Sequence, residues 1–362
     1  MKLFDPVKLG TLKLSNRTVM APMTRSMSPN GTPGEDVARY YERRALGGVG
    51  LIITEGLEID YPGAVHDAAV PHFYSPQTLA VWARIAKLVQ TAGTAFVPQL
   101  WHVGGYPDKA SCSLKQSMSP SGVYKPGSVF GAPATQREID DVIEAYAKAA
   151  AAALTIGCDG IELHGAHGYL LDQFFWPETN RRSDGYGGDV AARTRFACEV
   201  VAACRRTTRP DFPIFFRFSQ WKLQDYDARL CRSPAELEQF LTPLVDAGVD
   251  LFDCSTRRFW IPEFDGSEMN LAGWTQKLSG RPAMTVGSVG LENDVVNALR
   301  EGSNSGFSSN LNLLEIMLER GDFELVGIGR ALISDASWVD KVRRGAFAEL
   351  RGFNKADLLT LS

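Results

Sequence analysis

The stretch Gly157-Cys158-Asp159-Gly160-Ile161-Glu162-Leu163-His164 decides the fold, because a glycine at the end of a helical pattern introduces a short apolar strand. The same arrangement recurs at residues 50–56, 248–254 and 321–329. Further strand candidates at 18–22, 94–101, 213–218 and 283–286 bring the number to eight. Near-continuous apolar strands that alternate with helices are typical of a parallel sheet covered by helices, and eight such units close a barrel.

The sequence therefore predicts an α/β protein, a single (β/α)8 TIM barrel, with residues 1–362 forming one domain. Residues 6–17 alternate weakly about Gly10-Thr11, and we expect a β-hairpin there that closes the bottom of the barrel. Residues 102–134, after the third strand, are rich in Gly, Pro and Ser and too long for an ordinary connection. They are expected to form a long insertion over the active face.

Helix boundaries are also marked in the sequence. Ser75-Pro76 should open one helix, and the pairs Thr135/Glu138 and Ser233/Glu236 each match a capping box. The last two helices should end near Gly157 and Gly248, because glycine is common just past a helix C-terminus.

Composition places the chain among ordinary globular proteins, with 44% hydrophobic and 22% charged residues and a formal net charge of −4. Both signs are mixed along the chain, so neither a nucleic-acid partner nor a membrane surface is indicated. No signal peptide or spanning segment is found, and we expect a cytoplasmic protein. None of the six cysteines forms a C-x-x-C pair, so we expect free thiols and no metal site.

Three polar side chains gather where the strand that ends at His164 opens into its loop: His164, His167 and Tyr169. Two imidazoles and a phenol at one strand end can donate hydrogen bonds to an oxygen and pass a proton. The alternative is a pair of structural histidines beside a buried tyrosine. In a barrel, function collects where strands end, which favours the catalytic interpretation.

The last two strand ends carry Gly287-Ser288 and Gly329-Arg330. Glycine lets backbone N–H groups approach an anion, and arginine binds phosphate through a planar fork. The alternative is turn glycines with a surface arginine. No G-x-G-x-x-G motif occurs, so a phosphorylated cofactor held in the barrel fits better than a nicotinamide in a Rossmann domain. Gln99 and Arg217 are suited to the edges of a flat heterocycle.

With these residues in view, the sequence resembles the old yellow enzyme family of flavin ene-reductases. The matching motifs occur in family order over roughly residues 3–345: Ala21-Pro22-Met23-Thr24-Arg25, Ile52-Ile53-Thr54-Glu55-Gly56, Gln99-Leu100-Trp101, His164-x-x-His167-Gly168-Tyr169-Leu170, Asn180-x-Arg182-x-Asp184-x-Tyr186-Gly187-Gly188, Val286-Gly287-Ser288 and Gly329-Arg330-Ala331-Leu332. The resemblance implies an FMN-containing TIM barrel that uses NADH or NADPH to reduce activated C=C bonds.

The resemblance also implies a role for each matching residue. Pro22, Met23 and Thr24 should border a non-covalently bound FMN, with the Thr24 hydroxyl near a ring carbonyl. Gly56, Gln99 and Arg217 should contact the ring or ribityl chain, and Gly287, Ser288, Gly329 and Arg330 the phosphate. His164 and His167, together with Trp101, should bind a small-molecule enone or nitro substrate, and Tyr169 should deliver the proton.

Some positions depart from the family pattern. Threonine stands at position 24, where one branch has cysteine, and histidine at position 167, where asparagine is frequent. The tail 350–357 lacks the Tyr-Gly-Gly pattern that many relatives carry there. Phe353 is expected to form the part of the site wall that this pattern forms in those relatives. The chain lacks the four-cysteine iron–sulfur motif and added domains of longer relatives, so it is expected to work with FMN alone, as a monomer or homodimer.

Two other classes compete with the ene-reductase. A barrel aldolase or isomerase would want a Schiff-base lysine or paired carboxylates at strand ends. No strand end carries a lysine, but Glu55, Glu162 and Asp253 keep the carboxylate option open. A flavin-binding sensor or store would keep the barrel without turnover; Tyr169 with both histidines argues against it, because binding alone needs no proton donor.

Overall fold

The computed structural model describes residues 1–106, 118–294 and 303–362, and within them eight parallel strands close into one barrel in the order β10-β11-β12-β3-β4-β5-β8-β9. The strands are β3 (Thr18–Met20), β4 (Leu51–Glu58), β5 (Ala95–Trp101), β8 (Ile161–His167), β9 (Ile214–Lys222), β10 (Leu251–Ser255), β11 (Ala283–Val286) and β12 (Leu325–Ile328). The predicted TIM barrel is confirmed.

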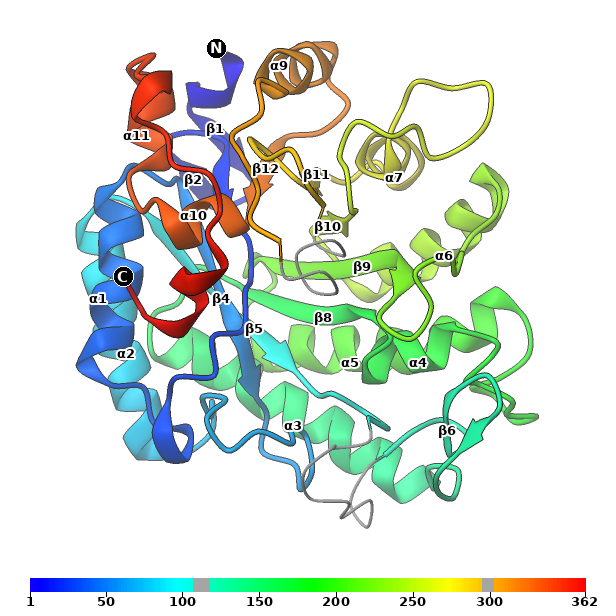
Figure 1. The fold of residues 1–362 in the computed structure, drawn as a ribbon. Helices are drawn as coiled ribbons and strands as arrows, with labels where there is room; N and C mark the ends of the chain where they lie inside the picture. Colours follow the sequence, from blue (N-terminus) through cyan, green and yellow to red (C-terminus); the bar gives the residue numbers. More distant parts are fainter. Residues whose placement is uncertain (107–117, 295–302) are drawn as a thin grey trace.

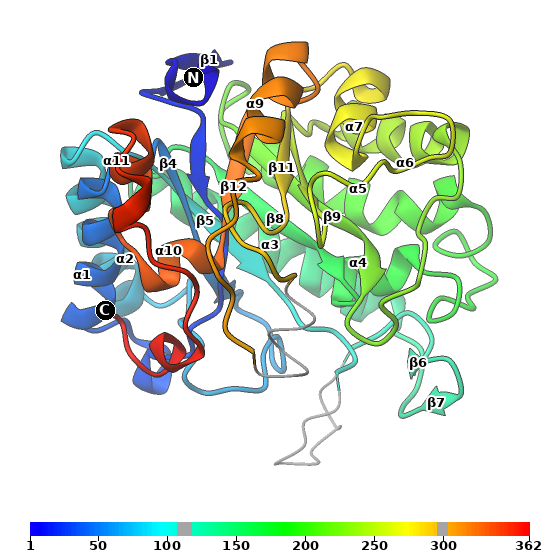
Figure 2. The same ribbon diagram turned by 45° about the horizontal axis from the view of Figure 1, so that its top comes forward.

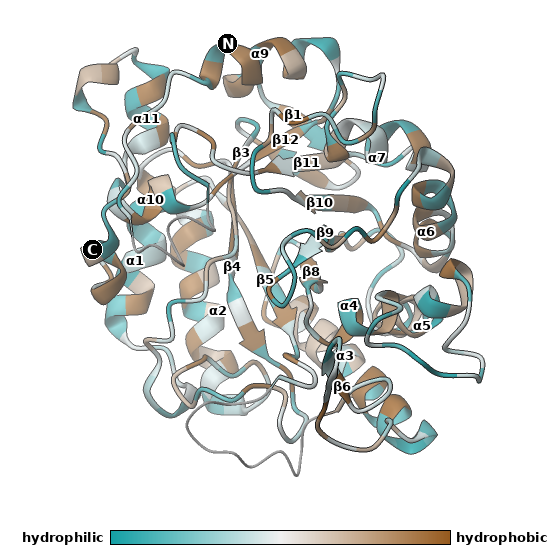
Figure 3. Ribbon diagram, turned by 45° about the vertical axis from the view of Figure 1, so that its right-hand side comes forward, coloured by the Kyte–Doolittle hydropathy of each residue, from teal (hydrophilic) through white to brown (hydrophobic). Residues whose placement is uncertain are grey.

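Helices surround these strands (Figure 1). The longer ones are α1 (Glu35–Leu46), α2 (Pro76–Thr91), α3 (Gln136–Thr155), α5 (Val190–Thr207), α6 (Pro234–Ala247), α7 (Leu271–Ser279) and α9 (Leu311–Arg320). The short ones are α4 (Leu170–Phe175), α10 (Arg330–Ser334) and α11 (Trp338–Arg343), and η5 (Lys355–Leu359) lies in the C-terminal segment. Figure 3 shows polar and apolar residues on each outer helix, as expected for helices with one face on the strands.

The helix signals act largely as the sequence indicates. Thr135 and Glu138 form the reciprocal capping box of α3. At α6 the Ser233 hydroxyl accepts from the Glu236 N–H, but the Glu236 carboxylate accepts from the N–H of Arg232 at 2.7 Å. The second predicted capping box is therefore displaced by one residue. Gly248 ends α6 in the left-handed region, with φ of 118°.

The N-terminal hairpin closes one end of the barrel, as predicted. Its strands are β1 (Val7–Leu9) and β2 (Leu12–Leu14). Leu12 and Leu14 are buried in one cluster with inward-facing residues of the barrel strands. Figure 2 shows the hairpin at one end and β6–β7, two strands of the insertion after β5, at the other.

That insertion contains β6 (Val123–Lys125) and β7 (Ser128–Val129). The Tyr106 ring at its start lies 5.2 Å from Tyr124 and 6.1 Å from Tyr169, measured between centroids. This contact supports the expected place of the insertion beside the active face. The part at 107–117, with Cys112, lies outside the described residues. The remaining five cysteines are free thiols.

Two strands extend beyond their predicted ends. β8 continues through Gly165 to His167, and β9 runs four residues past Phe218 to Lys222. Lys222 is fully buried because its ammonium bonds the buried Asp172 carboxylate at 2.7 Å. An apolar pattern cannot detect a strand end that is buried through an ion pair. Among the described residues, no helix has the length and apolar character needed to cross a membrane.

Candidate active site

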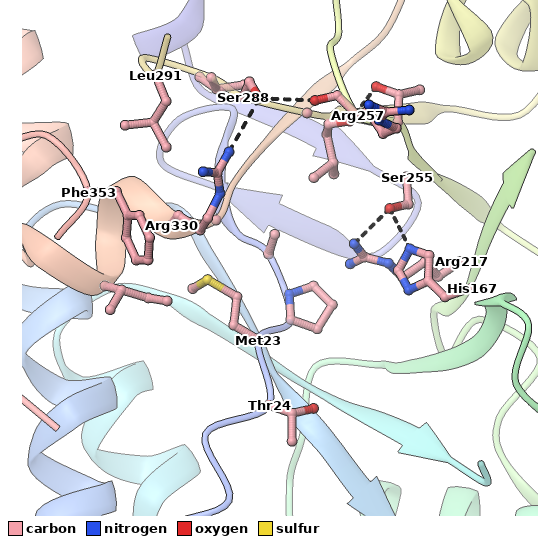
Figure 4. Close-up of a pocket in the computed structure, with 18 of the residues that line it drawn as sticks. Met23, Thr24, His167, Arg217, Ser255, Arg257, Ser288, Leu291, Arg330 and Phe353 are labelled. Atoms are coloured by element: carbon pink, nitrogen blue, oxygen red, sulfur yellow. Dashed lines mark hydrogen bonds between the residues drawn. The ribbon is translucent and has the colours of Figure 1, made fainter. Parts of the chain in front are cut away.

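A cavity opens at the carboxyl ends of the strands, where barrel proteins place their active sites (Figure 4). It is lined by residues on or directly after β3, β8, β9, β10, β11 and β12 and by residues of the C-terminal segment. The lining residues are Ala21, Pro22, Met23, Thr24, His167, Arg217, Trp221, Ser255, Thr256, Arg257, Val286, Gly287, Ser288, Val289, Leu291, Gly329, Arg330, Ile333, Phe353 and Leu358.

One end of the cavity is built for an anion. Gly287 has φ of 153°, and a Cβ there would lie 2.6 Å from the Thr256 Oγ1, so no side chain fits. Ser288 follows with φ of 52°, and its hydroxyl lies 3.0 Å from the carbonyl oxygen of Arg257. Arg330 closes this end: its Nη2 donates to the Asn293 carbonyl at 2.6 Å and lies 3.4 Å from the Ser288 hydroxyl.

The Arg330 guanidinium keeps a free donor. Among the described residues, its buried Nη1 has no hydrogen-bond partner. Burial lowers the pKa of Arg330 to about 10, so it stays charged at neutral pH. The Phe353 ring lies 5.5 Å from this guanidinium, which puts Phe353 in the wall at the anion end. A buried cation with a spare donor beside a glycine backbone fits a phosphate group.

Arg217 lies across the cavity from Arg330 (Figure 4). Its Nη1 donates to Asp253 at 2.8 Å and its Nη2 to the Ser255 hydroxyl at 3.1 Å. Its buried Nε has no partner among the described residues. A flat heterocycle with carbonyl groups could accept from this unused edge. The two ends together fit a phosphorylated flavin.

The remaining predicted cofactor residues divide into two groups. Pro22, Met23 and Thr24 line the cavity directly after β3, as does Gly329 after β12. Gln99 and Gly56 are not among the lining residues. Gln99 is buried and donates from Nε2 to Glu162 at 2.8 Å. A Cβ on Gly56 would lie 2.5 Å from the Trp101 ring, so glycine is needed for that ring to pack here.

Both predicted histidines are brought together, with ring centroids 5.2 Å apart. His167 has φ of 64°, an unusual conformation for a non-glycine residue that often marks functional sites. Its ring stacks on Trp221 at 4.5 Å, and its Nε2 lies 2.8 Å from the Ser255 hydroxyl. Burial holds the pKa of both imidazoles well below the usual value, and the Arg217 charge adds to this effect. Both rings are therefore neutral at physiological pH.

Tyr169 completes the predicted group. Its ring meets Trp101 edge-on at 5.0 Å and His164 edge-on at 5.1 Å. Burial raises the pKa of Tyr169, so the phenol keeps its proton at neutral pH. A protonated phenol beside two neutral imidazoles can supply hydrogen bonds and one proton to a bound molecule.

Sequence reasoning missed Ser255 and Trp221. Ser255 is the last residue of β10, one position past the predicted end, and Trp221 lies on the unpredicted extension of β9. The signal for Ser255 was available, because residues at barrel strand ends read as functional. Trp221 needed the length of β9, which rests on the buried Lys222 ion pair.

The model of the NADH:flavin oxidoreductase / NADH oxidase family matches residues 2–349. An NADH oxidase from Thermoanaerobacter brockii is 32% identical over 96% of this chain and 52% of its own length. A metal reductase from Desulforamulus reducens is 37% identical over 59% of this chain. The chain covers only 52% and 32% of the lengths of these two relatives. A 12-oxophytodienoate reductase from Oryza sativa is 31% identical over 98% of this chain and 89% of its own length.

Solved structures agree with the fold. A morphinone reductase in complex with tetrahydroNAD has a TM-score of 0.80 at 26% identity, over 99% of this chain and 94% of its own. An old yellow enzyme homologue from Zymomonas mobilis has the same TM-score of 0.80 at 24% identity, over 99% of this chain and 96% of its own. The second likeness bears on the fold alone.

Proposed function

Because this chain belongs to the NADH:flavin oxidoreductase / NADH oxidase family, we propose that it is an FMN-dependent NAD(P)H:acceptor oxidoreductase of the old yellow enzyme type, acting as one FMN-binding domain. The acceptor is an α,β-unsaturated carbonyl or nitro compound. FMN bound in this cavity would supply the hydride chemistry, from NAD(P)H to the β-carbon of the acceptor.

The residues of the chain divide the remaining work. Arg330, Gly287 and Ser288 would hold the FMN phosphate, Arg217 would bind the ring edge, and Pro22, Met23 and Thr24 would border the ring. His164 and His167 donate to the acceptor oxygen, where negative charge develops. Tyr169 then protonates the α-carbon. Trp101 positions Tyr169 through the edge contact at 5.0 Å.

The observation that carries this proposal is the meeting of two neutral imidazoles and one protonated phenol, of which the His167 imidazole lines the cavity. A flavin store has no need of a proton donor. An aldolase or isomerase would need a free lysine or free carboxylates at strand ends. Contrary to the sequence expectation, β9 does end in a lysine, but Lys222 is buried and paired with Asp172. Glu55 accepts from the Arg25 N–H at 2.9 Å, while Glu162 and Asp253 bind Gln99 and Arg217.

The test is a stopped-flow titration in two half-reactions. Purified protein should be yellow and release FMN on denaturation. NADH or NADPH should bleach the colour without oxygen, and cyclohexenone should restore it. Colourless protein that cannot be loaded with FMN would contradict the proposal, and reduced protein that no enone or nitroalkene reoxidises would favour the store.

A further inference from the structure

Two buried carboxyl groups lie behind Arg217, on strands far apart in the sequence. Glu162 on β8 and Asp253 on β10 both have 0% exposed area. Glu162 accepts from the Gln99 amide at 2.8 Å through Oε1, and Asp253 accepts from Arg217 at 2.8 Å through Oδ2. None of the four roles assigned above, which are phosphate binding, ring binding, acceptor binding and protonation, is assigned to either carboxyl.

Each carboxyl has one oxygen left over. Oε2 of Glu162 and Oδ1 of Asp253 are buried, and no N–H or hydroxyl group of the described residues donates to them. Glu162 and Asp253 also interact directly with each other, and this interaction disfavours a second negative charge on the pair. An ionised carboxylate only accepts hydrogen bonds, so a bond between two carboxyls requires a proton on one of them.

The charges of the neighbouring side chains also indicate that the pair carries one proton. Gln99 on β5 is neutral, and His164 and His167 at the end of β8 are neutral because burial depresses the pKa of both rings. Arg217 on β9 is the one cation that interacts with the pair among the described residues. Two ionised carboxylates beside one cation would leave an uncompensated buried charge, which is strongly unfavourable.

Glu162 and Asp253 differ in how strongly each carboxyl holds a proton. Burial raises the pKa of Glu162 well above its usual value, and the neighbouring Asp253 adds to this. Burial also raises the pKa of Asp253, but Arg217 opposes that rise through a direct ion pair. The proton therefore resides on Glu162 and the negative charge on Asp253.

We infer that Glu162 holds a proton that it shares with Asp253, so that the pair presents one negative charge to Arg217 and thereby sets the redox potential of the flavin. The second half of this inference rests on the flavin placement proposed above. Glu162 and Asp253 are positioning residues, because they act on the flavin only through Arg217.

The consequence for the flavin follows from electrostatics. Reduction adds negative charge to the ring, which the Arg217 cation stabilises and the Asp253 carboxylate offsets. Asp253→Asn removes that carboxylate charge and keeps the shape, so it should shift the flavin potential to more positive values. Glu162→Gln replaces a neutral group by a neutral group of the same shape, so the potential should stay close to that of the wild type.

The proton itself is tested by infrared spectroscopy, which needs no turnover. Burial raises the pKa of Glu55, Glu58 and Glu263 only to about 7, so at pH 9 these groups are ionised. The wild-type spectrum at pH 9 should retain the carbonyl stretch of a protonated carboxylic acid, and Glu162→Gln should lose it. A wild-type spectrum without the band, or a band that survives Glu162→Gln, overturns the shared proton.

The potentials are measured on FMN-loaded wild type, Glu162→Gln, Asp253→Asn and the control Glu199→Gln, whose carboxyl binds Tyr186 from the outer helix α5. An equal positive shift in Glu162→Gln and Asp253→Asn would show that both carboxyls are ionised and overturn the inference. FMN content is determined first. Wild-type protein that binds no FMN would count against the proposed function, while the infrared result, obtained also on apoprotein, would still decide the proton.

Discussion

Nε2 of His167 lies 2.8 Å from Oγ of Ser255, and the same oxygen accepts a hydrogen bond from Nη2 of Arg217 at 3.1 Å. One hydroxyl thus connects the histidine proposed to bind the acceptor with the arginine proposed to bind the flavin (Figure 4). Trp221 stacks on the His167 imidazole at 4.5 Å, so the ring is held both by this stacking contact and by the Ser255 hydroxyl at Nε2.

Because His164 and His167 are neutral, we expect a particular pH dependence of phenol binding. Phenols should bind to the oxidised enzyme as phenolates and give a long-wavelength charge-transfer band. Affinity should fall as the pH drops below the pKa of the phenol itself, with no tightening near pH 6.5, the ordinary histidine pKa. No tightening is expected because the pKa of both imidazoles lies well below the usual value, so neither ring gains a positive charge as the pH falls through 6.5. A spectral titration from pH 5 to 9 measures this.

Replacing both His164 and His167 by alanine should abolish the charge-transfer band and weaken phenol binding. The control is His72→Ala, because His72 pairs with Glu58 and does not line the cavity. Phenol affinity that survives the double change would place the anion site elsewhere.

Tyr169→Phe should slow enone reduction by roughly 10²–10⁴-fold and leave flavin reduction by NAD(P)H nearly intact, because only enone reduction needs a general acid. Nitroalkenes should be affected less, since hydride transfer gives them a stabilised nitronate. Stopped-flow measurement of the two half-reactions separates these effects. Tyr106→Phe, one ring away, is the control. Equal slowing of both half-reactions would mean that another group supplies the proton.

Arg330→Ala should weaken FMN binding on the order of 10- to 100-fold, because a charge-assisted hydrogen bond contributes about 1.5–3 kcal/mol. Fluorescence titration of apoprotein with FMN gives the affinity. The matched control is Arg281→Ala, an exposed arginine just before β11, at the end of that strand away from the cavity. Unchanged FMN affinity in the Arg330 variant would remove the phosphate assignment.

Thr24→Ala should make the flavin harder to reduce, because its hydroxyl can donate to a ring carbonyl that gains electron density on reduction. A neutral hydrogen bond contributes about 0.5–1.5 kcal/mol, so a small negative shift of the potential and a slower NAD(P)H half-reaction are expected. Thr24→Ser keeps the hydroxyl and should behave like wild type. The same potential in all three proteins would exclude Thr24 from the mechanism.

Lys222→Met should destabilise the fold by about 3–5 kcal/mol, because it leaves the buried Asp172 carboxylate without its cation. Lys125→Met, at an exposed position on β6, is the control and should change little. Thermal unfolding followed by circular dichroism measures the difference. A small effect at Lys222 would show that water or another donor can satisfy Asp172.

The sequence by itself determined the barrel and pointed to most of the residues proposed for the site. Glycines before apolar runs marked the eight barrel strands, and the approximate strand ends pointed to His164, His167, Tyr169 and Arg330, because a change in the local sequence pattern marks roughly where a strand stops. In the folded chain, His167 and Arg330 line the cavity, and the His164 ring lies next to the rings of His167 and Tyr169.

Only the tertiary structure decided what surrounds them. Glu162 and Asp253 were open candidates for carboxylate chemistry until the pairing of β8, β9 and β10 placed both beside Arg217. Ser255 and Trp221 joined the site because β9 extends through a buried ion pair and β10 ends one residue later than predicted. Partners that lie 36 to 88 residues apart, such as Arg217 with Asp253 and His167 with Ser255, meet through strand register. No local pattern specifies that register, because it is set by packing across the whole barrel.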